Sequence, residues 1–302
     1  MTYNFLTLHE LQPHQIASAI AAFLKVPSDS VDVADADGDQ DDRNWDTAAL
    51  CDYSRVQGDI SLSLDVDVQE WVPDQPNEAD AALAFAVNSR TAVLYPAEEN
   101  LPSAYWLVTP DPIVTRARLN ASDDDPPTYT VEAVEEPVRA LPAAQVMQLP
   151  EILQAQKIPT PTADQFTAAI QKLRESQDNA TDPLLKDEPG TLLYEARVGL
   201  FLWERMVRRM ESGWEPSGRY PLDMYRKDLQ LRDELAQYTL TAPPSVRELL
   251  SDSVQQLDDV VAQHTVQDEH GVLIGRPSGE SSQHSKLGWW WHRTPEPAPW
   301  TT

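Results

Sequence analysis

The chain has 302 residues, 41% of them hydrophobic, so it can bury one large or two ordinary cores and is not disordered throughout. It carries 49 acidic and 23 basic residues, a net charge of -26. Residues 1–145 hold 26 acidic and 7 basic residues, whereas residues 146–302 hold 23 and 16. A field of this sign repels nucleic acid and anionic membranes and attracts basic proteins, although it also serves solubility alone. We therefore expect a basic protein partner, no nucleic acid and no membrane.

The sequence predicts a cytoplasmic protein. Its first residues lack the basic and apolar regions of a signal peptide, and no apolar run approaches the roughly 18 residues of a membrane span. The single cysteine, Cys51, cannot form an internal disulfide, which fits a reducing compartment. The oligomeric state stays open.

The first half combines two helices with several short strands. Helical spacing of apolar residues predicts helices over 13–26 and 77–88, the second capped by Asn77 or Asp74. Alternation and short apolar runs predict strands over 30–34, 47–56, 59–68, 91–95, 104–108, 113–119 and 129–134. Because hairpins dominate, we expect residues 1–140 to form an acidic α+β domain on a mostly antiparallel sheet.

The second half is predicted to be helical. Four prolines in residues 141–161 indicate a linker. Residues 162–270 then show helical periodicity in about four segments, which predicts a helical bundle. Residues 271–302 are rich first in Gly and Ser and then in Trp and Pro, so we expect an extended tail.

An aspartate-rich loop follows the strand expected over 30–34 and suggests either a calcium site or a surface for a basic partner. Asp35, Asp37, Asp39, Asp41 and Asp46 fall at positions 1, 3, 5, 7 and 12 of an EF-hand loop. The pattern departs at position 6, where Gln40 replaces the required glycine, and at position 8, where Asp42 replaces an apolar residue. Without a counter-charge so many carboxylates would repel one another.

Two further groups of residues are candidates for partner binding. Asp65 and Asp67 alternate with apolar residues along 59–68 and should form a wet, acidic strand face. Trp289, Trp290 and Trp291 stand side by side in the tail, either packed on the bundle or exposed as an aromatic anchor.

The sequence contains none of the common catalytic signatures. It has no GxSxG, P-loop, GxGxxG or CxxC pattern, and its 10 glycines leave little material for a nucleotide-binding loop. We therefore expect no catalytic residues and no cofactor. An enzyme remains an alternative only as a hydrolase that holds a divalent metal on the loop aspartates.

Residues 1–145 resemble, in outline, acidic α+β immunity proteins encoded beside bacterial polymorphic toxins of actinobacterial type. The resemblance rests on the early helix, the acidic loop with Asn44, Trp45 and Asp46, the hairpin through Gln57 and Gly58, and the segment 82–98. Segments 225–235, 257–265 and 288–295 resemble an uncharacterised helical module.

The resemblance implies an immunity protein, or antitoxin, that occludes the active site of a basic toxin domain. The acidic loop would then enter a cationic cleft with Trp45 as its apolar anchor. The residues expected to bind the partner are Asp35, Asp37, Asp39, Asp41, Asp42, Trp45, Asp46, Asp65, Asp67, Trp289, Trp290 and Trp291. The alternatives are a calcium-binding module, a metal-dependent hydrolase, and a scaffold component that docks through its Trp/Pro tail.

Overall fold

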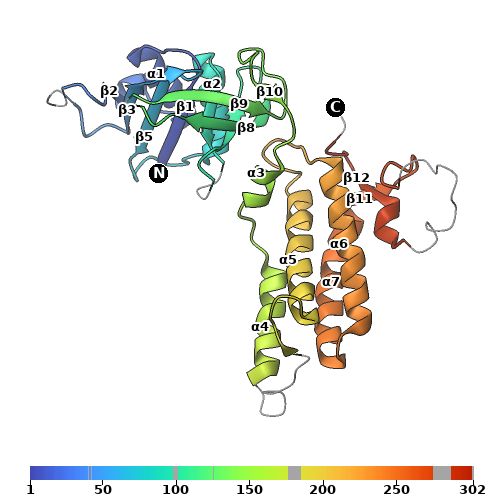
Figure 1. Ribbon diagram of the computed structural model, residues 1–302. Coiled ribbons are helices and arrows are strands. Elements are labelled where there is room, and N and C mark those ends of the chain that lie inside the picture. Colours follow the sequence, from blue (N-terminus) through green and yellow to red (C-terminus); the bar gives the residue numbers. More distant parts are fainter. Residues whose placement is uncertain are drawn as a thin grey trace. The chain divides into compact units, whose positions relative to one another are not determined.

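The computed structural model describes residues 1–39, 41, 43–97, 101–124, 126–175, 185–274 and 287–300 (Figure 1). The chain divides into two compact units, Met1–Lys157 (unit 1) and Ile158–Thr302 (unit 2). The predicted α+β class is confirmed, because unit 1 holds a ten-stranded sheet and the long helices lie in unit 2. None of the helices in the described ranges is long and apolar enough to cross a membrane.

In its described residues, unit 1 combines a large sheet with three α-helices and a short 3-10 helix, Ser28–Ser30. Its helices are α1 (Pro13–Leu24), α2 (Glu78–Ser89) and α3 (Pro150–Ala155). Its strands are β1 (Thr2–Thr7), β2 (Val31–Asp35), β3 (Ala49–Arg55), β4 (Gln57–Gly58), β5 (Leu62–Val68), β6 (Val93–Pro96), β7 (Ala104–Val108), β8 (Val114–Ala121), β9 (Thr128–Val134) and β10 (Gln145–Val146).

The sheet has the strand order β10-β9-β8-β7-β6-β1-β5-β3-β2. Most neighbours are antiparallel, as predicted, whereas β2 pairs parallel with β3. Helices α1 and α2 cover one face, where apolar residues of alternate strand positions form the main core (Figure 1). The predicted Asn77 cap is confirmed, since its side chain accepts a hydrogen bond of 2.9 Å from the Asp80 amide at the start of α2.

A second core lies on the other face of the sheet because the sheet curves. The short strand β4, which follows β3, pairs with β9 near the opposite edge of the sheet. Gly58 makes this close approach possible, since a Cβ atom there would lie 2.0 Å from the Tyr129 carbonyl oxygen. Residues such as Leu107, Val131 and Val138 are buried in this second core.

Two features of unit 1 differ from the sequence-based expectations. Strand β1 was not predicted, although it lies between β5 and β6 and buries Tyr3 and Phe5. Most of the expected linker 141–161 belongs to the folded unit, where β10 pairs with β9 and α3 buries Ile152. The spacing of the prolines obscured these short elements, because Pro150 begins α3 instead of ending a helix.

Unit 2 is a helical bundle with a folded tail. Its helices are α4 (Pro161–Glu175), α5 (Leu192–Glu211), α6 (Leu222–Thr241) and α7 (Pro244–His264), and β11 (Thr265–Gln267) pairs with β12 (Arg293–Pro295). The fully buried carboxylate of Glu204 accepts hydrogen bonds of 3.0 and 2.7 Å from the Thr162 and Ala163 amides, at the N-terminus of α4. This carboxylate therefore joins α5 to α4.

The tryptophans of the tail mostly pack against the bundle. The indole N–H groups of Trp290 and Trp291 donate to the two carboxylate oxygens of Asp233, at 2.9 and 2.8 Å. Both side chains are buried, whereas Trp289 is 40% exposed. These contacts and the β11–β12 pairing hold the described residues 287–300 against unit 2, so of the two alternatives for the tryptophans the packed one applies to Trp290 and Trp291.

Candidate binding face

Four carboxylates lie on the sheet face that is turned away from α1 and α2. Because side chains alternate across a strand, the burial of Cys51 and Tyr53 under the helices directs Asp52 to the other face. Asp65 lies directly opposite Asp52 in the antiparallel register of β3 and β5. Asp32 of β2 and Asp67 of β5 complete the set. We call these four residues the acidic face: Asp32, Asp52, Asp65 and Asp67.

The acidic face already holds one guanidinium group, supplied by the chain itself. Nε of Arg43 donates to Asp32 at 2.8 Å, and its Nη1 donates to Asp52. The guanidinium carbon lies 5.1 Å from the centre of the Trp45 ring, and the Arg43 side chain is only 5% exposed. Paired carboxylates with an aromatic ring above them form a binding arrangement suited to arginine.

The other two carboxylates of the acidic face have no such partner. Burial and the neighbouring charges of Asp52 and Asp67 raise the pKa of Asp65 above its usual range. Asp67 accepts a hydrogen bond of 2.7 Å from the Thr2 hydroxyl. Among the described residues, no cation pairs with Asp65 or Asp67. A cation placed over them would relieve this repulsion.

The loop aspartates make contacts of their own, apart from those of the acidic face. Asp35 pairs with Arg55 at 3.0 Å and accepts a hydrogen bond from the Asp37 amide. The exposed Asp39 accepts a hydrogen bond of 3.0 Å from the Asp41 amide, so both belong to the turn itself. Asp46 is also exposed, and the expected partner contact Asp42 lies outside the described residues.

The described residues of this loop do not assemble a calcium site. Within the described ranges, no three side chains of His, Cys, Asp or Glu come together in a group that could hold a metal ion. The loop carboxylates bind amides and Arg55 instead, because the segment before them is strand β2 and not the helix of an EF-hand. The arrangement therefore gives no support to the calcium-module and metal-hydrolase alternatives.

Sequence reasoning missed the central residues of the acidic face. Asp65 and Asp67 were identified from alternation in β5, but the same alternation in β3 places Asp52 on that face. Asp32 could not be assigned to it from the sequence, because its position depends on the parallel pairing of β2 with β3. Arg43 follows a run of acidic residues, so the sequence alone does not indicate which carboxylates it binds.

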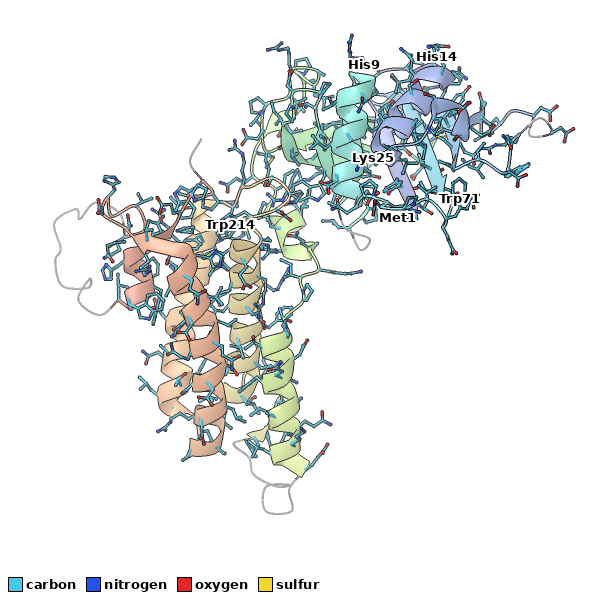
Figure 2. All side chains as sticks on the ribbon, turned by 180° about the vertical axis from the view of Figure 1, so that it is seen from behind. Met1, His9, His14, Lys25, Trp71 and Trp214 are labelled. Atoms are coloured by element: carbon cyan, nitrogen blue, oxygen red, sulfur yellow. The ribbon has the colours of Figure 1, made fainter. Side chains whose placement is uncertain are left out.

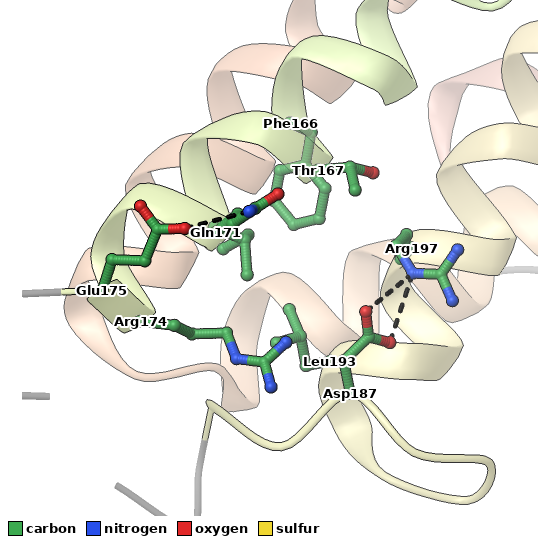
Figure 3. Close-up of a pocket in the computed structure, with 9 residues that line it drawn as sticks. Phe166, Thr167, Gln171, Arg174, Glu175, Asp187, Leu193 and Arg197 are labelled. Carbon is green, nitrogen blue, oxygen red and sulfur yellow. Dashed lines mark hydrogen bonds and ion pairs between the residues drawn. The ribbon is translucent and has the colours of Figure 1, made fainter. Parts of the chain in front are cut away.

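A separate pocket of about 460 Å³ lies in unit 2, between α4 and α5 (Figure 3). Its charged walls pair internally: Nε of Arg197 lies 3.1 Å from Asp187, and Gln171 donates to Glu175 at 2.9 Å. Phe166 and Leu193 supply apolar wall. Because its acidic and basic groups are mixed and mostly paired, this pocket does not define a ligand class.

Comparison with protein-family models, curated proteins and solved structures finds no match to this chain. The class of function must therefore be inferred from the acidic face and its charges.

Proposed function

We propose that unit 1 is a protein-binding module whose acidic face holds arginine or lysine side chains of a basic partner. The observation that carries this proposal is the pair of uncompensated carboxylates, Asp65 and Asp67, beside an arginine that is already bound. A partner cation placed there would gain from two carboxylates, and the partner's departure would restore their repulsion.

In this proposal the acidic face, and not the aspartate-rich loop, makes the direct contacts with the partner. The carboxylates of Asp35 and Asp39 already have partners within or beside the loop, whereas those of Asp65 and Asp67 are exposed on strand β5. Trp45 is 58% exposed and stacks on Arg43, so it can present its other ring face as an apolar anchor next to the carboxylates. The acidic loop then supplies long-range attraction, and the acidic face supplies the contacts.

The particular role that we propose is that of a cytoplasmic immunity protein. The outline resemblance of residues 1–145 to such proteins implies a toxin domain as the partner, blocked when its cationic active site is covered. The single cysteine, Cys51, is buried and without a disulfide, which agrees with a reducing compartment. The tail is a weaker docking candidate, because Trp290 and Trp291 are buried against Asp233.

A pull-down with the product of the adjacent gene tests this role. We expect the native chain to capture a basic protein, and Asp65→Asn/Asp67→Asn to weaken capture at least about tenfold. The matched control is Asp123→Asn/Asp124→Asn, which removes the same charge from an exposed turn elsewhere in unit 1 and should leave capture nearly unchanged. Equal losses in the two variants would contradict a role for the acidic face, and no binding would contradict the immunity role.

A further inference from the structure

A second pocket lies in unit 1, and its lining holds two arginines and a histidine but one acidic residue, in contrast to the acidic surplus of that unit. It has a volume of about 470 Å³. Four segments line it: the end of β1, the start of β6, the β7–β8 turn and the segment after β9. His9, Arg90 and Arg139 line it together with apolar residues such as Ile113 and Val138. Figure 2 shows His9 at the end of β1 that is remote from Met1.

The two arginines of this pocket differ from the other arginines of unit 1. Four arginines of the unit form ion pairs with carboxylates: Arg43, Arg55, Arg116 and Arg118. Across the described parts of the chain, Arg90 and Arg139 have no such partner. Residues 1–145 hold 26 acidic residues, which offer many possible partners for an arginine. Two guanidinium groups that line one pocket without such a partner therefore point to an anion that the chain does not supply.

Helix capping explains part of this arrangement. Arg90 ends α2 in the left-handed conformation, with φ of 58°, and a cation is favourable at a helix C-terminus. Lys25 ends α1 in the same conformation, with φ of 58°, but does not line the pocket. Arg139 follows no helix, so capping does not account for its charge or for a second arginine in the lining of the pocket.

The walls of the pocket are fixed by hydrogen bonds. The Leu8 amide donates to the Ala92 carbonyl at 3.1 Å, and the His9 ring lies 3.0 Å from the Thr91 hydroxyl. The Thr109 amide donates to the Ile113 carbonyl at 3.0 Å, which closes the β7–β8 turn. The backbone around the pocket is therefore held in place before any ligand binds, whereas Arg90 and Arg139 are exposed and their side chains can turn toward a ligand.

The geometry points to a binding site for an organic anion, namely a carboxylate attached to an apolar body. Arg90 and Arg139 bind the carboxylate, for which the guanidinium group has matching geometry. Ile113, whose side chain is 41% exposed, and Val138 contact the apolar body. Asp111 also lines the pocket and disfavours ligands with a high negative charge. This inference does not depend on the function of the acidic face.

The same chemistry exists in a free carboxylic acid and in the C-terminus of a peptide chain. Phenylbutyrate and the peptide acetyl-Gly-Val-Leu represent these two sources, each matched with its own amide. The probes are added at about 10 mM to the full chain, and amide NMR signals of Ala92, Ile113 and Val138 are followed. A response to only one of the acids identifies the source, and a response to both shows that the pocket accepts either.

We expect shifts that saturate with at least one acid and are much smaller with its amide. Arg90→Gln and Arg139→Gln should each weaken binding about tenfold, whereas the control Lys25→Gln should not change it. Unchanged thermal unfolding would show that each variant remains folded. Equal binding of acid and amide, a response to inorganic phosphate but to neither acid, or no shift with any probe would overturn the proposal.

Discussion

At the scale of one residue, Arg43 offsets the repulsion between neighbouring carboxylates of the acidic face. Its guanidinium group lies between Asp32 and Asp52, and removing it would leave two partly buried carboxylates beside Asp65. We predict that Arg43→Ala lowers the free energy of unfolding by about 1–3 kcal/mol, measured by urea denaturation. The control Arg55→Ala removes a guanidinium group that is 59% exposed, and it should cost clearly less stability, because water screens an exposed ion pair. Equal losses would contradict a special role for Arg43.

Asp228 provides a second test at this scale, through pH. Burial raises the pKa of Asp228 to about 7, although a hydrogen bond of 2.7 Å from the Tyr220 hydroxyl opposes the shift. The folded chain thus holds this proton more tightly than the unfolded chain, whose aspartate pKa is about 4. The resulting stabilisation is present below about pH 4 and is lost as the pH rises through about 7.

We therefore predict that Asp228→Asn reduces the loss of stability between pH 4 and pH 7 by on the order of 2 kcal/mol. Urea denaturation at several pH values measures this change. An unchanged pH dependence in the variant would show that Asp228 does not titrate in this range.

At the scale of elements, the sequence predicted what local periodicity encodes. The helices of unit 2 and most strands of unit 1 were predicted because their apolar residues recur at a regular spacing. Strand β1 was missed because its alternation is too short to be recognised: Asn4 is the only polar residue between its apolar positions, and a threonine stands at each end. The acidic face was found only in part, since the parallel β2–β3 pair and the place of Arg43 depend on contacts that spacing does not encode.

The tail gives a prediction at the same scale. Asp233→Ala would leave the buried indole N–H groups of Trp290 and Trp291 without their acceptor. We expect a loss of about 2–4 kcal/mol in unfolding free energy, accompanied by a change in tryptophan fluorescence. Asp259→Ala is the matched control, because this exposed carboxylate accepts only an exposed hydrogen bond from Gln255 in the same helix. If the two variants lose the same stability, the tail is not held as described.

At the scale of the whole molecule, the two units are expected to fold separately. The cores of unit 1 are built from its own residues, from Tyr3 in the main core to Ile152 in α3. We predict that a chain of residues 1–157 shows a cooperative urea transition and well-dispersed amide NMR signals. A broad transition with exposed apolar surface would contradict this prediction.

The central claim is that the acidic face of unit 1 binds the cationic side chains of a partner protein. Its most direct test is an NMR titration of the full chain with an arginine-rich peptide, in the native form and in two variants. We predict saturable shifts at Thr2, Asp65 and Asp67 that weaken as salt is raised, are lost in Asp65→Asn/Asp67→Asn and persist in Asp123→Asn/Asp124→Asn. Shifts spread evenly over the acidic surface, or the same in both variants, would contradict the claim.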